Sequence, residues 1–286
     1  MNPLIFWIAG GDSFWVGLFL LIAITIGTSQ KRAILMLKTV LLLAAIILIV
    51  VSMTPLPYWW FGVLSLTVLL WLFAFRSSLL KEERKSLATR AVLFCGISGV
   101  ILELPYALLH SPEPPSERAL IILADSLTAG LIEDDFTWPK RLAERVNYPI
   151  VDLSHVGAVV GDGLTMIEEV ELNGQLVLIE LGGNDLLGST PGDEFHQNLN
   201  QLLKRLTEAN CRILMFELPL PPFRYDIAYS QRRLCDRYNV QLIPKRYLLS
   251  TIIGEGKTVD SLHLSDKGHA ELADFMEELL KPTMDL

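Results

Sequence analysis

The sequence predicts two parts, an all-α region of four transmembrane helices and, after it, an α/β domain with a five-stranded parallel sheet. Hydrophobic residues make up 51% of the chain, and they gather toward its beginning. The charge also changes along the chain: residues 1–116 hold 8 basic and 5 acidic side chains, whereas residues 117–286 hold 16 and 27. The resulting net charges of +3 and −11 suit the two parts to different solvents.

The first part contains four apolar stretches, 4–26, 34–53, 57–75 and 91–109. Each is close to the ~20 residues that cross a bilayer as a helix, and none shows the clear polar face of a helix in a soluble protein. Gly10, Gly11 and Asp12 leave open a later start of the first span, near Ser13. The N-terminus lacks the basic region of a signal peptide, so we expect this span to be retained.

The loops predict how these spans are oriented. Lys31 and Arg32 lie in the first loop, the second loop is uncharged, and the third, 76–90, holds five basic residues against two acids. Because positive loops stay in the cytoplasm, we expect a multi-pass protein of the cell (inner) membrane with both termini outside. The region after residue 110 is then periplasmic or extracellular. Glu103 is either a functional intramembrane carboxyl or a side chain that reaches interfacial water.

The Pro-rich segment "SPEPPSER" predicts a semi-rigid linker at 111–118, which separates a membrane region at 1–110 from a domain at 119–286. Cys211 and Cys235 could form a disulfide or remain buried thiols. No cysteine or histidine spacing indicates a metal site, and we expect no cofactor. The acidic charge and the lack of a basic stripe argue against nucleic-acid binding.

Short apolar runs in the second part predict strands at 119–124, 149–153, 175–181, 212–218 and 240–244. Amphipathic segments predict helices at 138–147, 162–171, 194–209, 225–238 and 265–281. Short apolar strands that alternate with helices indicate a parallel sheet covered on both faces. In such sheets the functional groups lie in the loops that follow the carboxyl ends of the strands.

Three of these loops carry residues suited to acyl chemistry. "ADSLTAG" after the first strand holds Asp125 and Ser126, the loop after the second holds Gly157, and "GGND" after the third holds Asn184. Each motif alone has an ordinary structural explanation, such as a helix cap, a turn glycine or a tight loop. Their coincidence at one sheet edge predicts a nucleophile with oxyanion donors.

Asp260 and His263 lie three residues apart near the C-terminus. This spacing suits a carboxylate that orients an imidazole, which then takes the proton of a serine. A salt bridge at the start of a helix is the alternative. We expect His196 and His269, inside predicted helices, to be solvated, and His155 stays ambiguous.

The four blocks, in this order over 117–286, resemble the SGNH (GDSL-type) hydrolase family. The bacterial periplasmic thioesterase/lysophospholipase group is the most similar, including "TWP" at 137–139. The resemblance implies a flavodoxin-like three-layer sandwich. It also implies the following roles: Ser126 as nucleophile, His263 as base, Asp260 as its partner, and an oxyanion hole made by the backbone N–H of Ser126 with Gly157 and Asn184.

The loop of Asp125 is expected to be supported by hydrogen bonds of its side chain. The sequence departs from the family pattern at Ala124, where a glycine is usual and a methyl group should narrow the approach behind the nucleophile. It also lacks the proline that often follows the family histidine.

The function expected from these observations is a membrane-anchored serine hydrolase that cleaves an acyl ester or thioester outside the cytoplasm. Its substrate is expected to be a lipid or otherwise membrane-associated. Two alternatives stay open: an acyltransferase that passes the acyl group to a sugar or lipid hydroxyl, and a non-catalytic membrane sensor or scaffold. The intact set of Ser126, Asn184 and His263 argues against the last.

Overall fold

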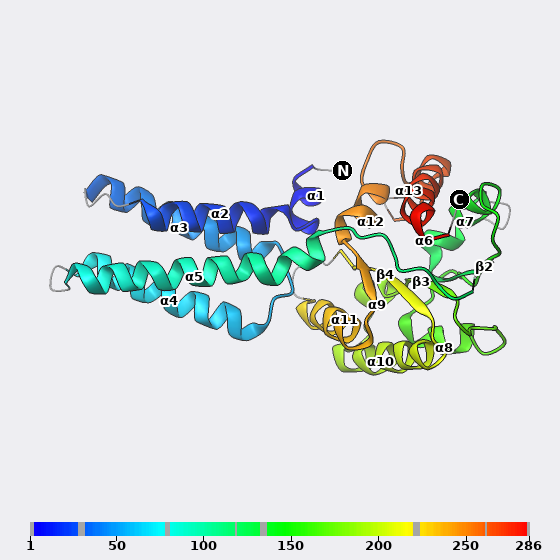
Figure 1. Ribbon diagram of the computed structural model, residues 1–286. Coiled ribbons are helices and arrows are strands. Elements are labelled where there is room, and N and C mark those ends of the chain that lie inside the picture. The colour runs from blue at the N-terminus through cyan, green and yellow to red at the C-terminus, as the bar shows by residue number, and fades with distance from the viewer. Residues whose placement is uncertain are drawn as a thin grey trace. The chain divides into compact units, whose positions relative to one another are not determined.

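The computed structural model describes residues 3–27, 32–77, 81–117, 119–131, 136–219, 224–260 and 262–284. The chain divides into two units. The helical unit comprises Trp7–Leu108, and the α/β unit comprises Leu109–Leu286 together with Met1–Phe6. Figure 1 shows the helices of the first unit and the sheet of the second.

The described residues of the helical unit form the end of α1 (Pro3–Ala9) and the helices α2 (Asp12–Ile26), α3 (Arg32–Val51), α4 (Tyr58–Arg76) and α5 (Glu82–Ala107). The first predicted span is not one continuous helix, because Gly11 has a left-handed φ of 92° and separates α1 (Pro3–Ala9) from α2. Among the described residues, α4 and α5 are long and apolar enough to cross a membrane. The apolar helical segments Asp12–Ile26 and Met36–Val51 are shorter.

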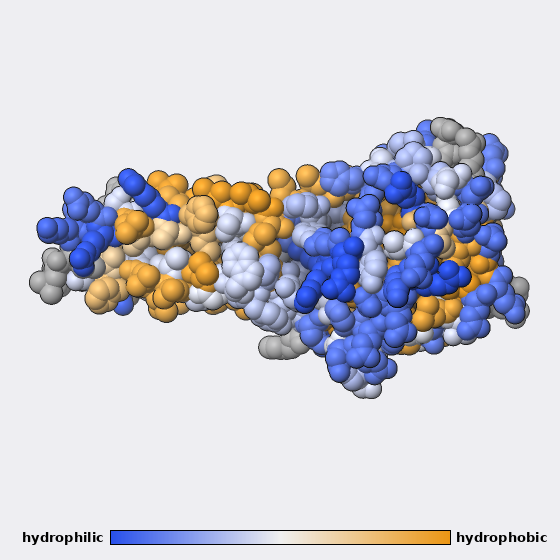
Figure 2. All heavy atoms as spheres, turned by 60° about the horizontal axis from the view of Figure 1, so that its bottom comes forward, coloured by the Kyte–Doolittle hydropathy of each residue, from blue (hydrophilic) through white to orange (hydrophobic). Residues whose placement is uncertain are grey.

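Packing within the helical unit joins α2 to α3 and α5, and α4 to α5. Trp60 is fully buried, and its Nε1 donates a hydrogen bond to Ser98 Oγ at 3.0 Å. The outward-facing side chains are apolar as well: Phe19 is 74% exposed and Phe94 77% exposed. Figure 2 shows hydrophobic residues over the surface of these helices. A helix bundle in water carries polar residues there instead.

The α/β unit contains a five-stranded sheet in the order β2–β1–β3–β4–β5, with every neighbouring pair parallel. The strands are β1 (Leu120–Ala124), β2 (Ile150–Asp152), β3 (Leu176–Glu180), β4 (Arg212–Phe216) and β5 (Gln241–Ile243). This is the flavodoxin-like strand order, so the predicted parallel sheet is confirmed. The long central strands β1 and β3 are buried along their whole length, as their unbroken apolar sequences predict.

Helices cover both faces of the sheet (Figure 1). On one face, side chains such as Leu120 and Ile122 pack with α7 (Trp138–Ala143), α12 (Lys245–Ile252) and α13 (Asp266–Met284). On the other face lie α10 (Gly192–Glu208) and α11 (Tyr225–Tyr238), which pack on each other. Because successive strand residues point to opposite faces, both layers bury apolar strand side chains.

Several helices differ from the predicted ones. α12 was not predicted, and α7 ends at Ala143 instead of 147. In place of a helix over 162–171, the chain forms a 3₁₀ turn, η1 (Val160–Asp162), followed by the single turn α8 (Gly163–Met166). A Cβ at Gly163 would lie 2.6 Å from Leu202 Cδ2, so this segment is shaped for close approach to α10. Single helical turns, α6 (Ser126–Ala129) and α9 (Gly183–Leu187), follow β1 and β3.

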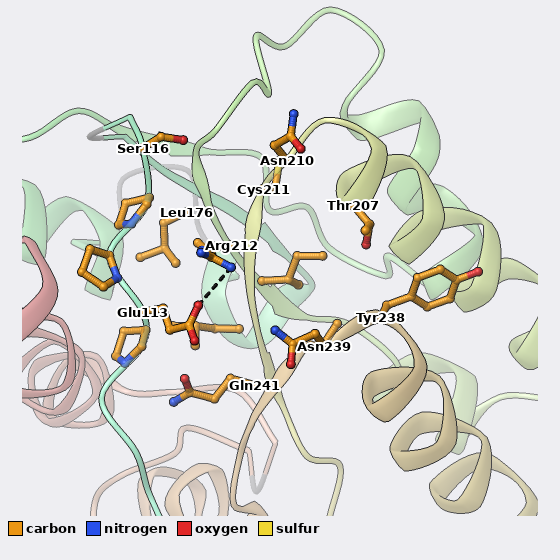
Figure 3. A pocket seen from close by; sticks show the side chains of 16 residues that line it. Glu113, Ser116, Leu176, Thr207, Asn210, Cys211, Arg212, Tyr238, Asn239 and Gln241 are labelled. Carbon is orange, nitrogen blue, oxygen red and sulfur yellow. Dashed lines mark ion pairs between the residues drawn. The ribbon is translucent and has the colours of Figure 1, made fainter.

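We expected the linker to act as a spacer, but its described residues pack against the α/β unit. Thr283 Oγ1 donates a hydrogen bond to the carbonyl of Pro112 at 2.6 Å, and Glu113 forms an ion pair of 3.0 Å with Arg212. Figure 3 shows this ion pair in a cavity of about 550 Å³. The cavity lies by the amino ends of β3 to β5, whereas Ser126 follows the carboxyl end of β1.

The contact between α4 and α5 generates a prediction with a matched control. A Cβ at Gly99 would lie 2.6 Å from Trp60 Cζ2, whereas a Cβ at Gly62 would meet nothing within 4 Å. Overpacking of this kind costs about 1–3 kcal/mol. We expect Gly99→Val to lower the melting temperature of the detergent-solubilised protein by several degrees, and Gly62→Val to leave it nearly unchanged. Equal melting temperatures for the two variants would contradict the packing described here.

Candidate active site

The nucleophile candidate lies directly after the buried strand β1. Asp125 follows the strand in extended conformation and accepts the backbone N–H of Leu127 on Oδ1 at 2.9 Å, which caps the short helix α6. Ser126 is the first residue of that helix and is only 9% exposed. Its Oγ lies 3.1 Å from His263 Nε2, across 137 residues of sequence. The fold thus brings the predicted serine and histidine together.

Asp260 holds the other side of the His263 ring. Its Oδ2 lies 2.7 Å from His263 Nδ1, and its Oδ1 accepts the backbone N–H groups of Leu262 and His263 at 3.1 and 2.9 Å. The His263 backbone N–H, the His263 ring and the Leu262 N–H lower the pKa of Asp260 to about 2. The ionised carboxylate favours a proton on Nδ1, which leaves Nε2 as the acceptor that faces the serine.

Asn184 lies at the start of α9, after Gly182 in a left-handed conformation with φ 112°. Its Nδ2 donates to the carbonyl of Ala158 at 2.9 Å and lies 3.4 Å from Asp125 Oδ2. Gly157, with φ 82°, precedes Ala158 in the loop that follows β2. Asn184 therefore connects the turn of Asp125 and Ser126 to the Gly157 loop. The part of the N–H of Gly157 in oxyanion binding stays a prediction.

A cavity of about 230 Å³ opens beside Ser126 and His263. Asp125, Glu180, Gly183 and Asn184 also line it, and the rest of its wall is formed by Leu127, Leu186, Leu187, Leu218, Pro219, Leu248, Ile252 and Leu262. This wall is aliphatic, so Ser126 and His263 lie beside a pocket suited to a hydrocarbon chain.

The comparisons with known proteins match the α/β unit of the chain. The family model of the GDSL-like Lipase/Acylhydrolase family matches residues 125–271, a range that includes Ser126, Asn184 and His263. The chain belongs to this family. It is therefore a hydrolase.

Two curated relatives of this GDSL-like hydrolase are bacterial. The arylesterase of Vibrio mimicus is 27% identical over 190 residues, which cover 60% of this chain and 93% of the relative. The thioesterase 1/protease 1/lysophospholipase L1 of Escherichia coli K12 is 28% identical over 178 residues, 58% of this chain and 85% of the relative. A crystal structure of the psychrotrophic esterase EstA from Pseudoalteromonas sp., inhibited by monoethylphosphonate, is 27% identical with a TM-score of 0.51. It covers 59% of this chain and all of its own.

The departures from the family pattern are accommodated in the hydrolase core. Ala124 is fully buried in the core beside Trp138 and is not among the residues that line the cavity. The narrowing behind the nucleophile that we expected from this methyl group stays a prediction. Leu264, where the family often has proline, is buried and forms an antiparallel bridge with Thr258. This bridge closes the loop that carries Asp260 and His263.

The hydrolase site also contains a buried carboxyl that the sequence analysis did not single out. Glu180, the last residue of β3, is fully buried, and its Oε2 accepts a hydrogen bond from Thr128 Oγ1 at 3.1 Å. Thr128 Oγ1 in turn accepts one from Trp138 Nε1 at 3.0 Å. Burial, and next the nearby charge of Asp125, raise the pKa of Glu180 well above that of an ordinary carboxyl. The sequence did contain a signal for this buried carboxyl, because Glu180 is an acidic residue at the end of an otherwise apolar strand.

Other candidate residues lie away from the catalytic groups. The expectation of a solvated His269 is wrong: it is buried, and its Nδ1 accepts the backbone N–H of Trp138 at 3.3 Å. His196 is half-buried, with Nδ1 3.3 Å from Ser230 Oγ, and His155 is exposed. Cys211 and Cys235 are buried free thiols, so the alternative of a disulfide between them is not realised.

The buried Asp125 generates a pH prediction. Its pKa is raised to about 6, because burial outweighs the stabilising Leu127 N–H and His263. The raised pKa means that the folded protein holds this proton more tightly than the unfolded chain, so stability falls as pH rises from about 4 to about 6. An asparagine at position 125 keeps one side-chain oxygen that can accept the Leu127 N–H, but it lacks the second oxygen, which faces Asn184 in the native protein. We expect Asp125→Asn to reduce this fall in melting temperature and to lower kcat by roughly 10–100-fold.

The matched control is Asp193→Asn, at an exposed carboxylate in the first turn of α10. Melting curves between pH 4 and 8 should give this variant the wild-type slope. A wild-type slope for Asp125→Asn as well would show that the carboxyl does not titrate as described.

Proposed function

We propose that this protein is a membrane-anchored serine hydrolase that cleaves an acyl ester or thioester outside the cytoplasm. The observation that carries the proposal is the alignment of Ser126 Oγ, the His263 ring and the Asp260 carboxylate at 3.1 and 2.7 Å, beside an aliphatic cavity. These distances are those of hydrogen bonds that transfer or orient a proton.

The first step of the proposed reaction forms an acyl-enzyme. Ser126 Oγ attacks the carbonyl carbon while His263 Nε2 takes its proton, and Asp260 stabilises the imidazolium that results. The leaving alcohol or thiol departs with the proton from His263. Water then attacks the acyl-enzyme with His263 again as base, which releases the acid and restores Ser126.

The oxyanion is proposed to be held by the Asn184 side-chain amide and the backbone N–H groups of Ser126 and Gly157. One N–H of Asn184 is fixed by the Ala158 carbonyl at 2.9 Å, which orients the amide. The other contact, to Asp125 Oδ2, is longer at 3.4 Å and therefore weak. A developing oxyanion is the stronger acceptor for this N–H.

The names of the relatives agree with acyl chemistry, since they include an arylesterase and a thioesterase/lysophospholipase. The aliphatic wall of the 230 Å³ cavity supports an acyl chain as the part of the substrate that it binds. Neither the names nor the cavity distinguish an oxygen ester from a thioester, because both leave the same acyl group on Ser126.

Membrane anchoring is supported by the apolar exterior of the helical unit and by its loops. Outward-facing residues such as Phe19 and Phe94 are stable against lipid chains but unfavourable in water. We propose that α2 to α5 each span the membrane. The basic loops between α2 and α3 and between α4 and α5 then lie in the cytoplasm, and the α/β unit lies outside it.

The nucleophile assignment predicts the loss of both turnover and covalent labelling. We expect Ser126→Ala to reduce esterase activity by several orders of magnitude and to abolish labelling by a fluorophosphonate, with an unchanged melting temperature. Ser154→Ala is the matched control, because this serine also lies in a loop after a strand, β2. A folded Ser126→Ala protein that retains more than a few per cent of activity would refute the assignment.

The topology prediction is tested by reporter fusions to the full chain. Alkaline phosphatase fused after Leu286 should be active, as an exported enzyme is, and the same reporter inserted near Ser86 should be inactive. The reverse pattern would place the hydrolase in the cytoplasm and overturn the proposed location.

A further inference from the structure

The α/β unit exposes large apolar side chains in a restricted set of places. Among its described residues from 109 onward, six such side chains are 43–67% exposed: Leu131, Phe136, Val156, Leu187, Val259 and Leu262. The outer faces of α7, α10, α11 and α13 expose none within the described residues. Scattered apolar residues are usual on a protein surface, but this distribution is confined to loops and to the last residue of the short helix α9.

All six residues, which we call the apolar rim, belong to segments at the carboxyl edge of the sheet. Leu131 and Phe136 follow β1 and α6, Val156 follows β2, and Leu187 ends α9 after β3. The loops after parallel strands share one edge. Val259 and Leu262 belong to the loop that His263 brings to Ser126.

The apolar rim is continuous with the wall of the active-site cavity. Leu187 is 67% exposed and Leu262 is 49% exposed, and both also line the 230 Å³ cavity beside Ser126. An acyl chain that enters the cavity therefore passes from one aliphatic surface to the next. This continuity indicates that a substrate enters the cavity across the rim.

The chemistry of the rim favours lipid chains over a protein partner. Five of its six side chains are aliphatic, whereas protein interfaces are enriched in Tyr, Trp and Arg. Electrostatic attraction to an anionic surface is also disfavoured, since residues 117–286 carry a net charge of −11. Contact with lipid must then come from apolar burial, which salt does not screen.

We propose that the apolar rim inserts into the surface of a lipid bilayer and admits an acyl chain from it directly into the cavity beside Ser126. This inference rests on the proposed acyl-hydrolase function and adds the route by which the substrate arrives. It identifies the substrate class as acyl esters of membrane lipids.

The test compares two esters on the full-length protein in phosphatidylcholine proteoliposomes. One ester is a soluble butyrate, and the other is a dodecanoyl ester of the same fluorogenic phenol carried in the vesicles. The polar variant Leu131→Asn/Val156→Asn should lose roughly tenfold in rate on the vesicle-borne ester and stay within twofold on the butyrate. Leu131→Met/Val156→Met, which keeps the rim apolar, should match the wild type on both. The rate of the wild type on the vesicle-borne ester should stay the same when the salt is raised to about 0.5 M NaCl, because salt does not screen an apolar contact.

Wild-type rates for the polar variant on both esters would overturn the proposal. Equal losses on both esters would overturn it too, because the substitutions would then act on the catalytic centre and not on lipid contact.

A second readout does not depend on turnover. Val156→Cys labelled with bimane should be quenched by brominated phosphatidylcholine, while Lys204→Cys on the exposed face of α10 should not; the three native cysteines are buried. Quenching without hydrolysis of either ester would refute the proposed function but leave the rim at the bilayer. The absence of quenching would refute lipid insertion, and the rim would then be a surface for a protein partner.

Discussion

The carboxylate of Asp125 accepts a hydrogen bond from the turn that carries Ser126 and lies within reach of the Asn184 amide, and the geometry of the candidate site depends on these two contacts. Oδ1 takes the Leu127 N–H, which fixes Ser126 at the start of α6. Oδ2 faces Asn184, whose amide also holds the Ala158 carbonyl. These contacts are possible because β1 lies between β2 and β3 in the sheet, so the three loops that follow these strands meet around one side chain.

A second buried acid, Glu180, lies near Asp125, and its charge matters for the candidate site. A negative Glu180 so close to Asp125 would oppose the negative charge that develops on the substrate oxygen. Burial, and next the charge of Asp125, raise the pKa of Glu180, which favours its neutral form, and Glu180 Oε2 accepts the Thr128 hydroxyl. Thr128 then connects to Trp138 at the start of α7, and the Trp138 backbone N–H connects to His269 on α13. The turn that carries Ser126 is thus supported by a chain of buried hydrogen bonds.

The sequence was sufficient for the sheet and for the loops that carry the site. Each strand is a short apolar run, and a parallel sheet places the following loops at one edge, so Ser126 and Asn184 could be placed before the structure was known. The burial of His269 had a signal that was overlooked: Leu272, Ala273 and Met276 lie three, four and seven residues further on, on the inward face of α13. The helix α12 had a weaker signal, since its Leu248, Leu249 and Ile252 make only one apolar turn after Pro244.

The linker and the buried acids were harder to predict for a physical reason. A Pro-rich segment has the same local conformation whether it is solvated or packed on a surface, and only the partners Thr283 and Arg212, far along the chain, decide between these states. The pairing of Asp125 with Glu180 depends in the same way on register, because Ala124 is opposite Glu180 across β1 and β3. Local patterns determine which residues form a strand, whereas the charge state of a buried acid depends on what the neighbouring strand places beside it.

The unfavourable features of the α/β unit are concentrated at one edge of its sheet. The burial of Asp125 and Glu180 and the exposure of leucines and valines each lower stability in water, and all of these residues lie at the carboxyl ends of β1 to β3 or in the loop that brings His263 to Ser126. The helices on the two faces, in contrast, bury their apolar residues, as Leu199 and Leu272 do. Residues in environments that lower stability are commonly found at functional sites. The acids accept hydrogen bonds from the turn that carries Ser126, and the exposed apolar residues are unfavourable only as long as they face water.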